Sequence, residues 1–249
     1  MADRAPAARG AHRGARGSPR GGAVAGRLRD EVRVIAFTIA VRARARGGSH
    51  MKVIVIGATG TIGTAVAEAL SAKHEVVRVS RKGQVQADLE DLASLHALFA
   101  KVREVDAVVS CAGSAAFRPL AQLGDEDFAL GLRSKLMGQV NLARVAMGAL
   151  KDGGSITLTG GVLAHEPMPG GAAISLVNAA LEGFVLGASL ELPRGLRLNL
   201  VSPPWITETL RALKMDPAGG MPAAACARAY VAAVEGKQQG ETIEARRFA

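Results

Sequence analysis

A glycine-rich turn between a strand-like run and a helix-like run constrains the fold of this chain more than any other feature. Residues Val53–Ile56 are apolar and mostly β-branched, which is typical of a buried strand. Gly57, Gly60 and Gly63 follow at a spacing of three, and Thr64–Leu70 then has helical periodicity. Such a unit brings backbone N–H groups and the positive end of a helix together. The sequence therefore predicts a binding site for a dinucleotide pyrophosphate.

Strand-like and helix-like runs alternate from Met51 onward. This alternation predicts a parallel sheet with helices on both faces, because parallel strands need long crossover connections. We therefore expect an α/β fold, a single Rossmann-like doubly wound sheet with its site at the carboxyl ends of the strands. Strands are predicted at Val53–Ile56, Glu75–Val79, Ala107–Ser110, Ser155–Thr159, Arg197–Val201 and, more weakly, Thr242–Glu244. Helices are predicted at Thr64–Lys73, Leu89–Val102, Asp125–Leu150, Ala172–Leu192 and Ala223–Val234.

The net charge of +9 is concentrated at the start of the chain. Residues 1–50 hold 11 arginines and only 3 acidic residues, so residues 51–249 are almost neutral. Because the arginines lack regular aromatic interleaving, with Phe37 the one aromatic residue among them, we expect no nucleic-acid partner. The apolar run Val34–Val41 is too short to span a bilayer, which needs about 20 residues, so we expect no membrane partner. Two widely separated cysteines suit a reducing cytosol, and we expect a cytoplasmic protein.

The first 50 residues are rich in Arg, Ala and Gly and lack amphipathic periodicity. We expect them to be a disordered extension that contributes nothing to catalysis. Gly48-Ser49-His50-Met51 resembles a vector-derived cloning scar, and Arg46–Gly48 can be encoded by a ribosome-binding-like stretch. The extension is thus either a start assigned upstream of Met51 or a tag-derived segment. Residues 51–249 then form one cofactor-binding domain.

Further landmarks make residues 51–249 resemble the short-chain dehydrogenase/reductase family. The turn Gly57–Gly63 resembles a G-x-x-G-x-x-G variant, although the family's commonest form has a glycine in place of Thr61. Cys111–Gly113 resembles the N-A-G element after the fourth strand, and Val201–Pro204 resembles the V-x-P-G turn beside the nicotinamide. Asp88-Leu89 resembles the pair that flanks the adenine ring. The resemblance implies the strand order 3-2-1-4-5-6-7 and an oxidoreductase that acts on a small-molecule substrate.

The end of the second strand indicates which cofactor is used. It reads Ser80-Arg81-Lys82, a hydroxyl and two cations, where an acidic residue would select NAD(H). A 2′-phosphate suits this set, so NADP(H) is favoured over NAD(H), although Arg81 and Lys82 can also simply solvate a surface loop. The predicted site contains no metal. Its cofactor-binding residues are Gly57, Thr59, Gly60, Thr61, Ile62, Gly63, Ser80, Arg81, Lys82, Asp88, Leu89, Cys111, Ala112, Gly113, Pro203 and Ile206.

The residues that the family usually uses for catalysis are replaced. Alignment through the long helix puts Ile174 at the position of the catalytic Tyr and Asn178 at that of the Lys four residues later. Gly161 stands at the position of the Ser, and Lys135 at that of the relay Asn. Losing a positioned acid or base typically costs about 10²–10⁴ in rate. Hydride transfer can still proceed by proximity on a substrate that needs little protonic help, such as an enone or imine.

Three residues are candidate replacements, each with a structural alternative. Lys135 is predicted either to donate a proton or to hold a substrate oxygen, or else to be a structural cation bonded to strand-turn carbonyls. Asn178 either keeps a ribose contact or satisfies the start of the helix. His165 is a candidate general acid or a surface-loop histidine. Trp205 either stacks on a flat substrate or nicotinamide, or fills the interior.

Three functions remain open from the sequence. The first is an NADP(H)-binding oxidoreductase with a non-standard site, the second a catalytically silent NADP(H)-binding interaction or regulatory protein, and the third a non-redox isomerase or cyclase. The family resemblance also implies a homodimer or homotetramer formed through helices four and five. Small and apolar residues on helix five would permit close helix contact, unless that face packs on the sheet. These residues are Ala179, Ala180, Gly183, Leu186, Gly187 and Leu190.

Overall fold

The computed structural model describes residues 50–249, which form one compact unit. All strands of its seven-stranded sheet are parallel and lie in the order β3-β2-β1-β4-β5-β6-β7. The predicted Rossmann-like fold and its strand order are confirmed. The predicted extension lies, apart from His50, outside the described residues. The strands are β1 (Lys52–Ile56), β2 (Glu75–Ser80), β3 (Val85–Gln86), β4 (Ala107–Ser110), β5 (Ser155–Thr159), β6 (Arg197–Ser202) and β7 (Thr242–Glu244).

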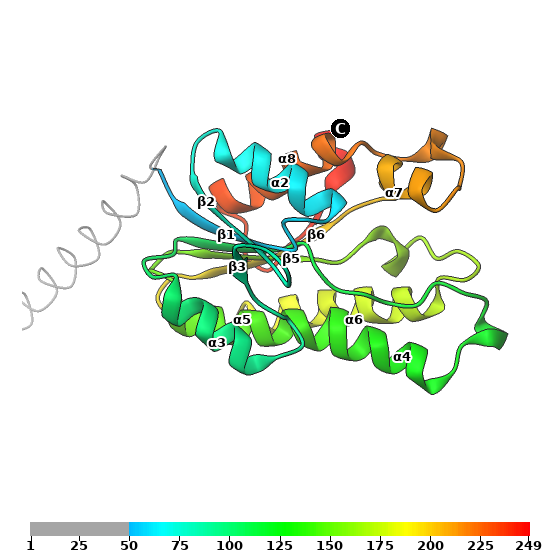
Figure 1. Ribbon diagram of the computed structural model, residues 1–249, viewed down its shortest axis with the longest axis horizontal. Coiled ribbons are helices and arrows are strands. Elements are labelled where there is room, and N and C mark those ends of the chain that lie inside the picture. The colour runs from blue at the N-terminus through cyan, green and yellow to red at the C-terminus, as the bar shows by residue number, and fades with distance from the viewer. Residues whose placement is uncertain (1–49) are drawn as a thin grey trace, which may run out of the picture. The chain divides into compact units, whose positions relative to one another are not determined.

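Helices cover both faces of the sheet (Figure 1). One face is covered by α2 (Thr61–Ser71) and α8 (Ala223–Glu235), which pack against each other. The other is covered by α3 (Leu92–Lys101), α4 (Asp125–Gly131), α5 (Gly138–Ala149) and α6 (Ala172–Ala188). A short helix, α7 (Thr207–Ala212), lies between β6 and α8. No helix within residues 50–249 is long and apolar enough to cross a membrane.

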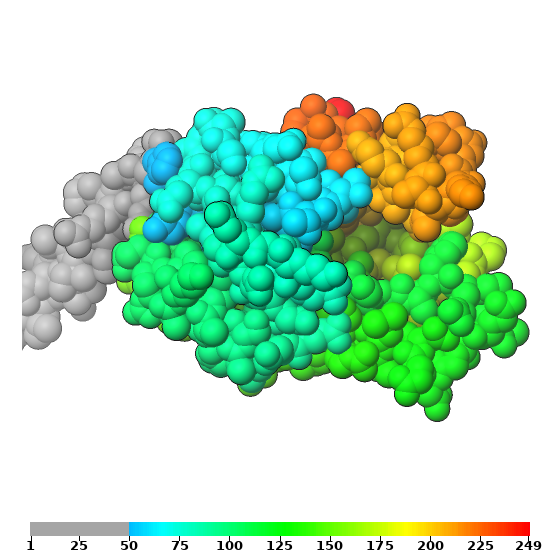
Figure 2. Space-filling model, in the orientation of Figure 1, coloured from blue at the N-terminus to red at the C-terminus, as the bar shows by residue number. Residues whose placement is uncertain are grey.

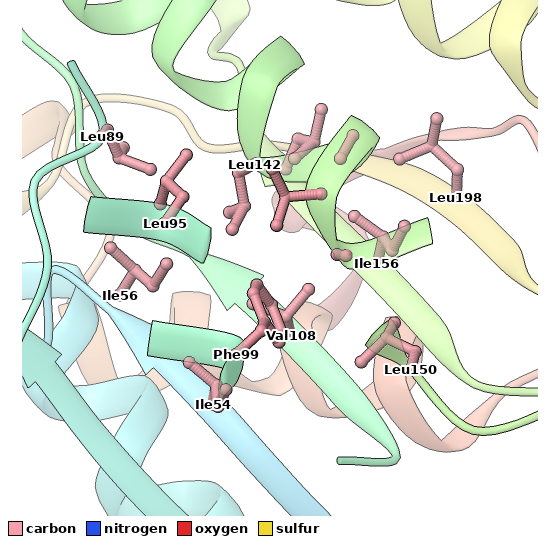
Figure 3. Close-up of a cluster of buried hydrophobic side chains, with 14 of the residues drawn as sticks. Ile54, Ile56, Leu89, Leu95, Phe99, Val108, Leu142, Leu150, Ile156 and Leu198 are labelled. Atoms are coloured by element: carbon pink, nitrogen blue, oxygen red, sulfur yellow. The ribbon is translucent and has the colours of Figure 1, made fainter. Parts of the chain in front are cut away.

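The central strands are buried on both sides because each side faces a helical layer. In β1, Val53 and Val55 belong to the core under α2 and α8, whereas Ile54 and Ile56 belong to the core under α3, α5 and α6. Figure 3 shows the second core, where Ile54 and Ile56 meet side chains such as Leu95 from α3. Because β1 is packed on both sides, its carboxyl end has a fixed position next to the ends of the neighbouring strands.

Element boundaries differ from the prediction where local polar contacts decide them. Helix α3 begins at Leu92 rather than Leu89, because the Asp91 side chain caps it by accepting a hydrogen bond from the Ala93 N–H at 2.9 Å. Strand β3 has only two residues, too few to leave a period in the sequence. Helix α7 was not predicted, since its six residues lie in what looked like a loop.

The helix predicted over Asp125–Leu150 contains a change of winding. Between α4 and α5 the chain forms a π-helical turn, η2 (Leu132–Met137). A π turn shifts the backbone hydrogen bonds by one residue and is frequent at functional sites. The Lys135 carbonyl accepts a hydrogen bond from the side-chain amide of Gln139 at 3.2 Å. The turn thus presents Lys135 toward the carboxyl end of the sheet.

Candidate active site

The predicted site residues converge at the carboxyl ends of the central strands. A cavity of about 260 Å³ opens there, and Figure 2 shows a hollow between the start of α2, the α7 segment and the green segment near α4. Most of its lining is apolar, and Lys135 is the one charged side chain in it. The lining residues are Ile62, Cys111, Ala112, Gly113, Lys135, Thr159, Gly160, Gly161, Val162, Leu163, Ile174, Asn178, Pro203, Pro204, Trp205, Ile206 and Thr209.

The glycine turn leaves a free helix end beside this cavity. Gly57 has φ +80°, and a Cβ there would lie 2.8 Å from the Cys111 carbonyl oxygen. A Cβ on Gly63 would collide with the Gly57 carbonyl. Gly60 precedes α2, and no side chain caps the first turn of that helix or adds an acidic group to it. The backbone amides from Thr61 onward are therefore open to an anion.

The predicted 2′-phosphate residues lie at the end of β2. The Ser80 hydroxyl is buried without a hydrogen-bond partner. The Arg81 and Lys82 side chains are exposed, and no carboxylate within residues 50–249 forms an ion pair with either of them. Arg81 interacts electrostatically with Glu90, whose ion pair is with Arg133. This set of one unsatisfied hydroxyl and two exposed cations suits a phosphate.

The predicted adenine pair follows β3. The Asp88 carboxylate accepts a hydrogen bond from the Glu90 N–H at 3.0 Å, which fixes the turn. Leu89 is buried, and a Cβ on Gly138 would lie only 3.0 Å from the Leu89 Cβ. Burial of Leu89 against Gly138 fixes the segment that would border the adenine ring.

Lys135 lies in the cavity wall between β4 and β5. Its stem packs on Gly113, where a Cβ would approach the Lys135 Cα, Cβ and Cγ to 2.9–3.1 Å. Its Nζ donates to the Gly160 carbonyl at 3.0 Å, and no carboxylate within residues 50–249 pairs with it. Burial lowers the pKa of Lys135 to about 8, because desolvation penalises the ammonium form. The residue therefore combines the bond expected of a structural cation with a position in the cavity.

The other replaced positions lie in the same wall. Asn178 is 1% exposed, and its Nδ2 donates to the Gly161 carbonyl at 3.1 Å while its Oδ1 has no partner. Gly161 has φ +154°, and a Cβ there would lie 2.9 Å from Asn178 Nδ2. Ile174 lines the cavity one turn earlier in α6 and brings no polar group. Carbonyl polarisation by a Ser-Tyr pair has no equivalent here.

The one tyrosine of the chain lies behind the cavity wall. Tyr230 is fully buried in α8, and its hydroxyl is 2.8 Å from Thr159 Oγ1. Because Thr159 Oγ1 donates to the Ser110 carbonyl, the Tyr230 hydroxyl is the donor of that pair. Burial raises the pKa of Tyr230 well above its usual value, so the phenol stays protonated and structural.

Gln139 is a positioning residue that sequence reasoning missed. It is fully buried, its Oε1 accepts from the Thr159 N–H at 2.8 Å, and its Nε2 donates to the Thr159 carbonyl at 2.9 Å. The same Nε2 reaches the Lys135 carbonyl of the π turn. Gln139 therefore ties the end of β5 to the segment that carries Lys135.

His165 and Trp205 lie in different positions relative to the cavity. His165 is outside the lining, with Nε2 2.6 Å from Glu182 Oε2 and a side chain that is 70% exposed. A catalytic role for His165 stays a prediction that this geometry does not favour. Trp205 lines the cavity and meets Phe117 edge to face, with ring centroids 5.6 Å apart. Trp205 is thus the aromatic side chain of the lining, and Phe117 supports it from outside the lining.

Comparisons with known proteins agree with this geometry. The model of a family described as enoyl-(acyl carrier protein) reductase matches residues 31–239. A hydroxynaphthalene reductase of Aspergillus fumigatus is 30% identical over 124 residues, which span 48% of this chain and only 45% of that relative. The Listeria innocua protein lin1944 is 40% identical with a TM-score of 0.75, over 78% of this chain and 98% of the other. A small-chain dehydrogenase in complex with NADPH is 25% identical with a TM-score of 0.69, over 79% of this chain and 96% of the other.

Proposed function

Because this chain belongs to the short-chain dehydrogenase/reductase family of oxidoreductases, we propose that it is an NADP(H)-dependent enzyme with a non-standard active site. The observation that carries the proposal is the set at the end of β2, where a buried unsatisfied Ser80 hydroxyl lies next to the exposed cations Arg81 and Lys82. The family neighbour in complex with NADPH supports the same choice. The open first turn of α2 would hold the pyrophosphate.

A bound nicotinamide cofactor would supply a hydride, and the chain's residues would supply position and one proton. The cavity wall from Gly113 to Pro203 orients the substrate, and its apolar side chains exclude water. Lys135, with a pKa of about 8, holds a proton at neutral pH and donates it to the reduced substrate. Asn178 keeps a ribose contact through its unsatisfied Oδ1. Without a Ser-Tyr pair, the substrates that fit best are enones or imines.

The cofactor proposal predicts a selective effect of the two cations. The double substitution Arg81→Ala and Lys82→Ala should weaken NADPH binding by about 10- to 100-fold and leave NADH binding within about twofold, because only NADPH carries the 2′-phosphate. Calorimetry at fixed salt measures both affinities. The matched control is Lys101→Ala, an exposed lysine at the end of α3.

The outcomes of that titration separate the candidate functions. Equal loss for both cofactors would contradict the phosphate role of Arg81 and Lys82, and no NADPH binding by the wild type would end the oxidoreductase proposal. Micromolar NADPH binding without turnover on a panel of enones, imines and ketones would favour the catalytically silent protein, which the loss of polar groups at Ile174 and Gly161 makes a specific second candidate.

We further propose that the enzyme is a cytoplasmic homo-oligomer that pairs through α5 and α6. Both cysteines are free, as suits a reducing compartment. On α6 the face predicted for close contact does not pack on the sheet: Ala179, Gly183 and Gly187 are exposed, and Leu186 is 61% exposed. A continuous face of small and apolar residues is typical of a covered helix pair.

Leu186→Glu should therefore convert the oligomer to a monomer, because it places a charge in the centre of the helix pair. Light scattering coupled to size exclusion measures the mass. Leu92→Glu is the control, since Leu92 is 43% exposed at the start of α3 and outside this face. A wild type that is already monomeric at micromolar concentration would overturn the proposal.

A further inference from the structure

Beyond cofactor binding, we propose that Lys135 is a covalent binding site whose amine forms an imine with a small apolar aldehyde or ketone in the cavity. An imine-forming lysine needs a reachable nitrogen, a stem held in place, a free amine form and room for the carbonyl compound. Lys135 meets these conditions through its own contacts. The proposal requires no cofactor, so it stands apart from the function proposed above.

The position of the nitrogen is fixed from two sides. Gly113 lacks the Cβ that would displace the Lys135 stem, and the Gly160 carbonyl accepts a hydrogen bond from Nζ at 3.0 Å. Lys135 lines the cavity, and within residues 50–249 the Gly160 carbonyl is the one hydrogen-bond acceptor of its Nζ. The π turn η2 and its bond to Gln139 hold the backbone from which the stem departs.

The charged groups on the surrounding elements are engaged elsewhere. On η2 itself, Arg133 pairs with Glu90 at 2.7 Å. On α6, Glu182 lies 2.6 Å from His165, and on α4, Asp127 contacts Arg118. Glu90 and Asp127 therefore have partners of their own, whereas Glu182 pairs through Oε2 and keeps a buried Oε1 without a partner.

The two cysteines and the tyrosine near the ends of the central strands stay neutral. Burial raises the pKa of the Cys111 thiol, which lines the cavity beside Lys135, and that of the Tyr230 phenol behind it. Burial also raises the pKa of Cys226 in α8 to about 12. These neutral groups bring no negative charge to Nζ. In addition, no carboxylate within residues 50–249 forms an ion pair with the Lys135 ammonium.

The absence of a counter-charge keeps the amine available. With its pKa lowered to about 8, Lys135 is about one-tenth free amine at pH 7. A lysine with the ordinary value is free amine to roughly one part in three thousand at that pH. Lys135 is thus richer in the nucleophilic form by about two orders of magnitude than a lysine with the ordinary pKa.

The lining selects the class of carbonyl compound. The cavity lining contains no second cation and no carboxylate. Lys135 is thus the one charged side chain that could bind a phosphate, and the rest of the lining suits an apolar ligand. A small aldehyde or ketone with an alkyl or aryl group matches this surface. The apolar side chains that would contact it are Ile62, Val162, Leu163, Ile174, Trp205 and Ile206.

The chemistry balances without another reactant. The nitrogen lone pair forms a C–N bond to the carbonyl carbon, and the carbonyl oxygen takes up a proton to give a carbinolamine. Both protons of the amine finally leave with that oxygen as water, and a C=N bond remains. Asn178 Nδ2 bonds to the Gly161 carbonyl, next to the Gly160 carbonyl that Lys135 uses, so both side chains are fixed on the same turn after β5.

Reductive trapping tests the site on the full chain without added cofactor. The protein is treated with butanal and cyanoborohydride at pH 7 for short times and digested with trypsin. Butylation of Lys135 blocks cleavage there and yields peptide 134–144, whereas the unmodified protein is cut after Lys135. We expect butylation of Lys135 at least tenfold faster than of the exposed Lys101, and a loss of that product in Lys135→Arg, which keeps a cation but forms no imine.

The butylation rates of Lys135 and Lys101 are both measured in the wild type. Their ratio therefore tests the proposal even if Lys135→Arg does not fold. Labelling of Lys135 no faster than of Lys101 would overturn it. So would a Lys135 rate that rises between pH 7 and 10 as steeply as that of Lys101, since an amine with the lower pKa should level off near pH 8 to 9. The NADPH titration gives an independent answer, so failure of either proposal leaves the other intact.

Discussion

Replacing Gly57 with alanine should weaken NADPH binding by at least 100-fold and lower the free energy of unfolding by about 2–4 kcal/mol. Gly57 has φ +80°, a conformation that costs a residue with a Cβ about 1–2 kcal/mol. The new Cβ would also lie 2.8 Å from the Cys111 carbonyl oxygen and 3.0 Å from the Ala112 Cβ. Since these neighbours are fixed at the end of β4, the turn itself must move.

That movement is the reason why cofactor binding should fall together with stability. The Gly57 N–H donates to the Val79 carbonyl at 2.9 Å, and the Cys111 N–H donates to the Ile56 carbonyl at 2.8 Å. The turn is thus tied to β2 and β4, and a shift would displace the open first turn of α2 from the pyrophosphate position. Cofactor sites lose affinity steeply when their amides move by an ångström.

Gly148→Ala is the matched control. Gly148 lies in α5, and a Cβ there would meet nothing within 4 Å. Alanine in a helix interior should stabilise the protein by about 0.5–1 kcal/mol and leave NADPH binding unchanged. Urea unfolding and NADPH titration measure both variants, and a Gly57→Ala protein that binds NADPH within threefold of wild type would refute the assignment of this turn.

The fold could be predicted because its signals are local and repeated. Strands such as β1 and β4 are mostly apolar runs, and the glycine turn marks the first crossover. Since the carboxyl ends of parallel strands meet at one edge, Gly57, Cys111 and Pro203 could be placed together before any coordinates. The structure brings all three to that edge.

The parts that could not be predicted depend on contacts distant in sequence. The π turn η2 lies inside a sequence pattern that is helical throughout. A π turn changes the backbone hydrogen bonds without requiring particular residue types, so the pattern does not reveal it. The roles of Gln139 and Tyr230 depend on Thr159, which is 20 and 71 residues away from them. Sequence periodicity does not predict hydrogen bonds between such distant residues. The contacts of Gln139 and Tyr230 with Thr159 could therefore not be predicted from the sequence.

Lys135→Met should have two effects of opposite sign. It should reduce turnover of any substrate that the wild type reduces by about 10²–10⁴, because the proton donor is lost. It should also stabilise the protein at pH 7 by about 2–3 kcal/mol, because methionine fills a similar volume without the cost of burying an ammonium. A substitution with a merely structural effect would lower both quantities together.

The sign of the pH dependence follows from the direction of the pKa shift. Lys135 has a pKa of about 8 in the folded protein, against an ordinary value of 10.5 that applies to the unfolded chain. Between these values the unfolded chain binds more protons, so the wild type gains stability as pH rises from about 8 to 10.5. Below pH 8 the folded wild type bears the full cost of desolvating the Lys135 ammonium. The free energy of unfolding of Lys135→Met should therefore differ most from that of the wild type in this range.

Urea unfolding at pH 7 and pH 10 measures this difference, with Lys101→Met as the control at an exposed position. The stability advantage of Lys135→Met should shrink by pH 10, and Lys101→Met should change little at either pH. A Lys135→Met protein that is less stable than wild type at pH 7 would mean that the bond from Nζ to the Gly160 carbonyl outweighs the desolvation cost, and Lys135 would then be a structural cation. A more stable and inactive variant would instead mean that the fold carries an unfavourable buried amine for the sake of its chemistry.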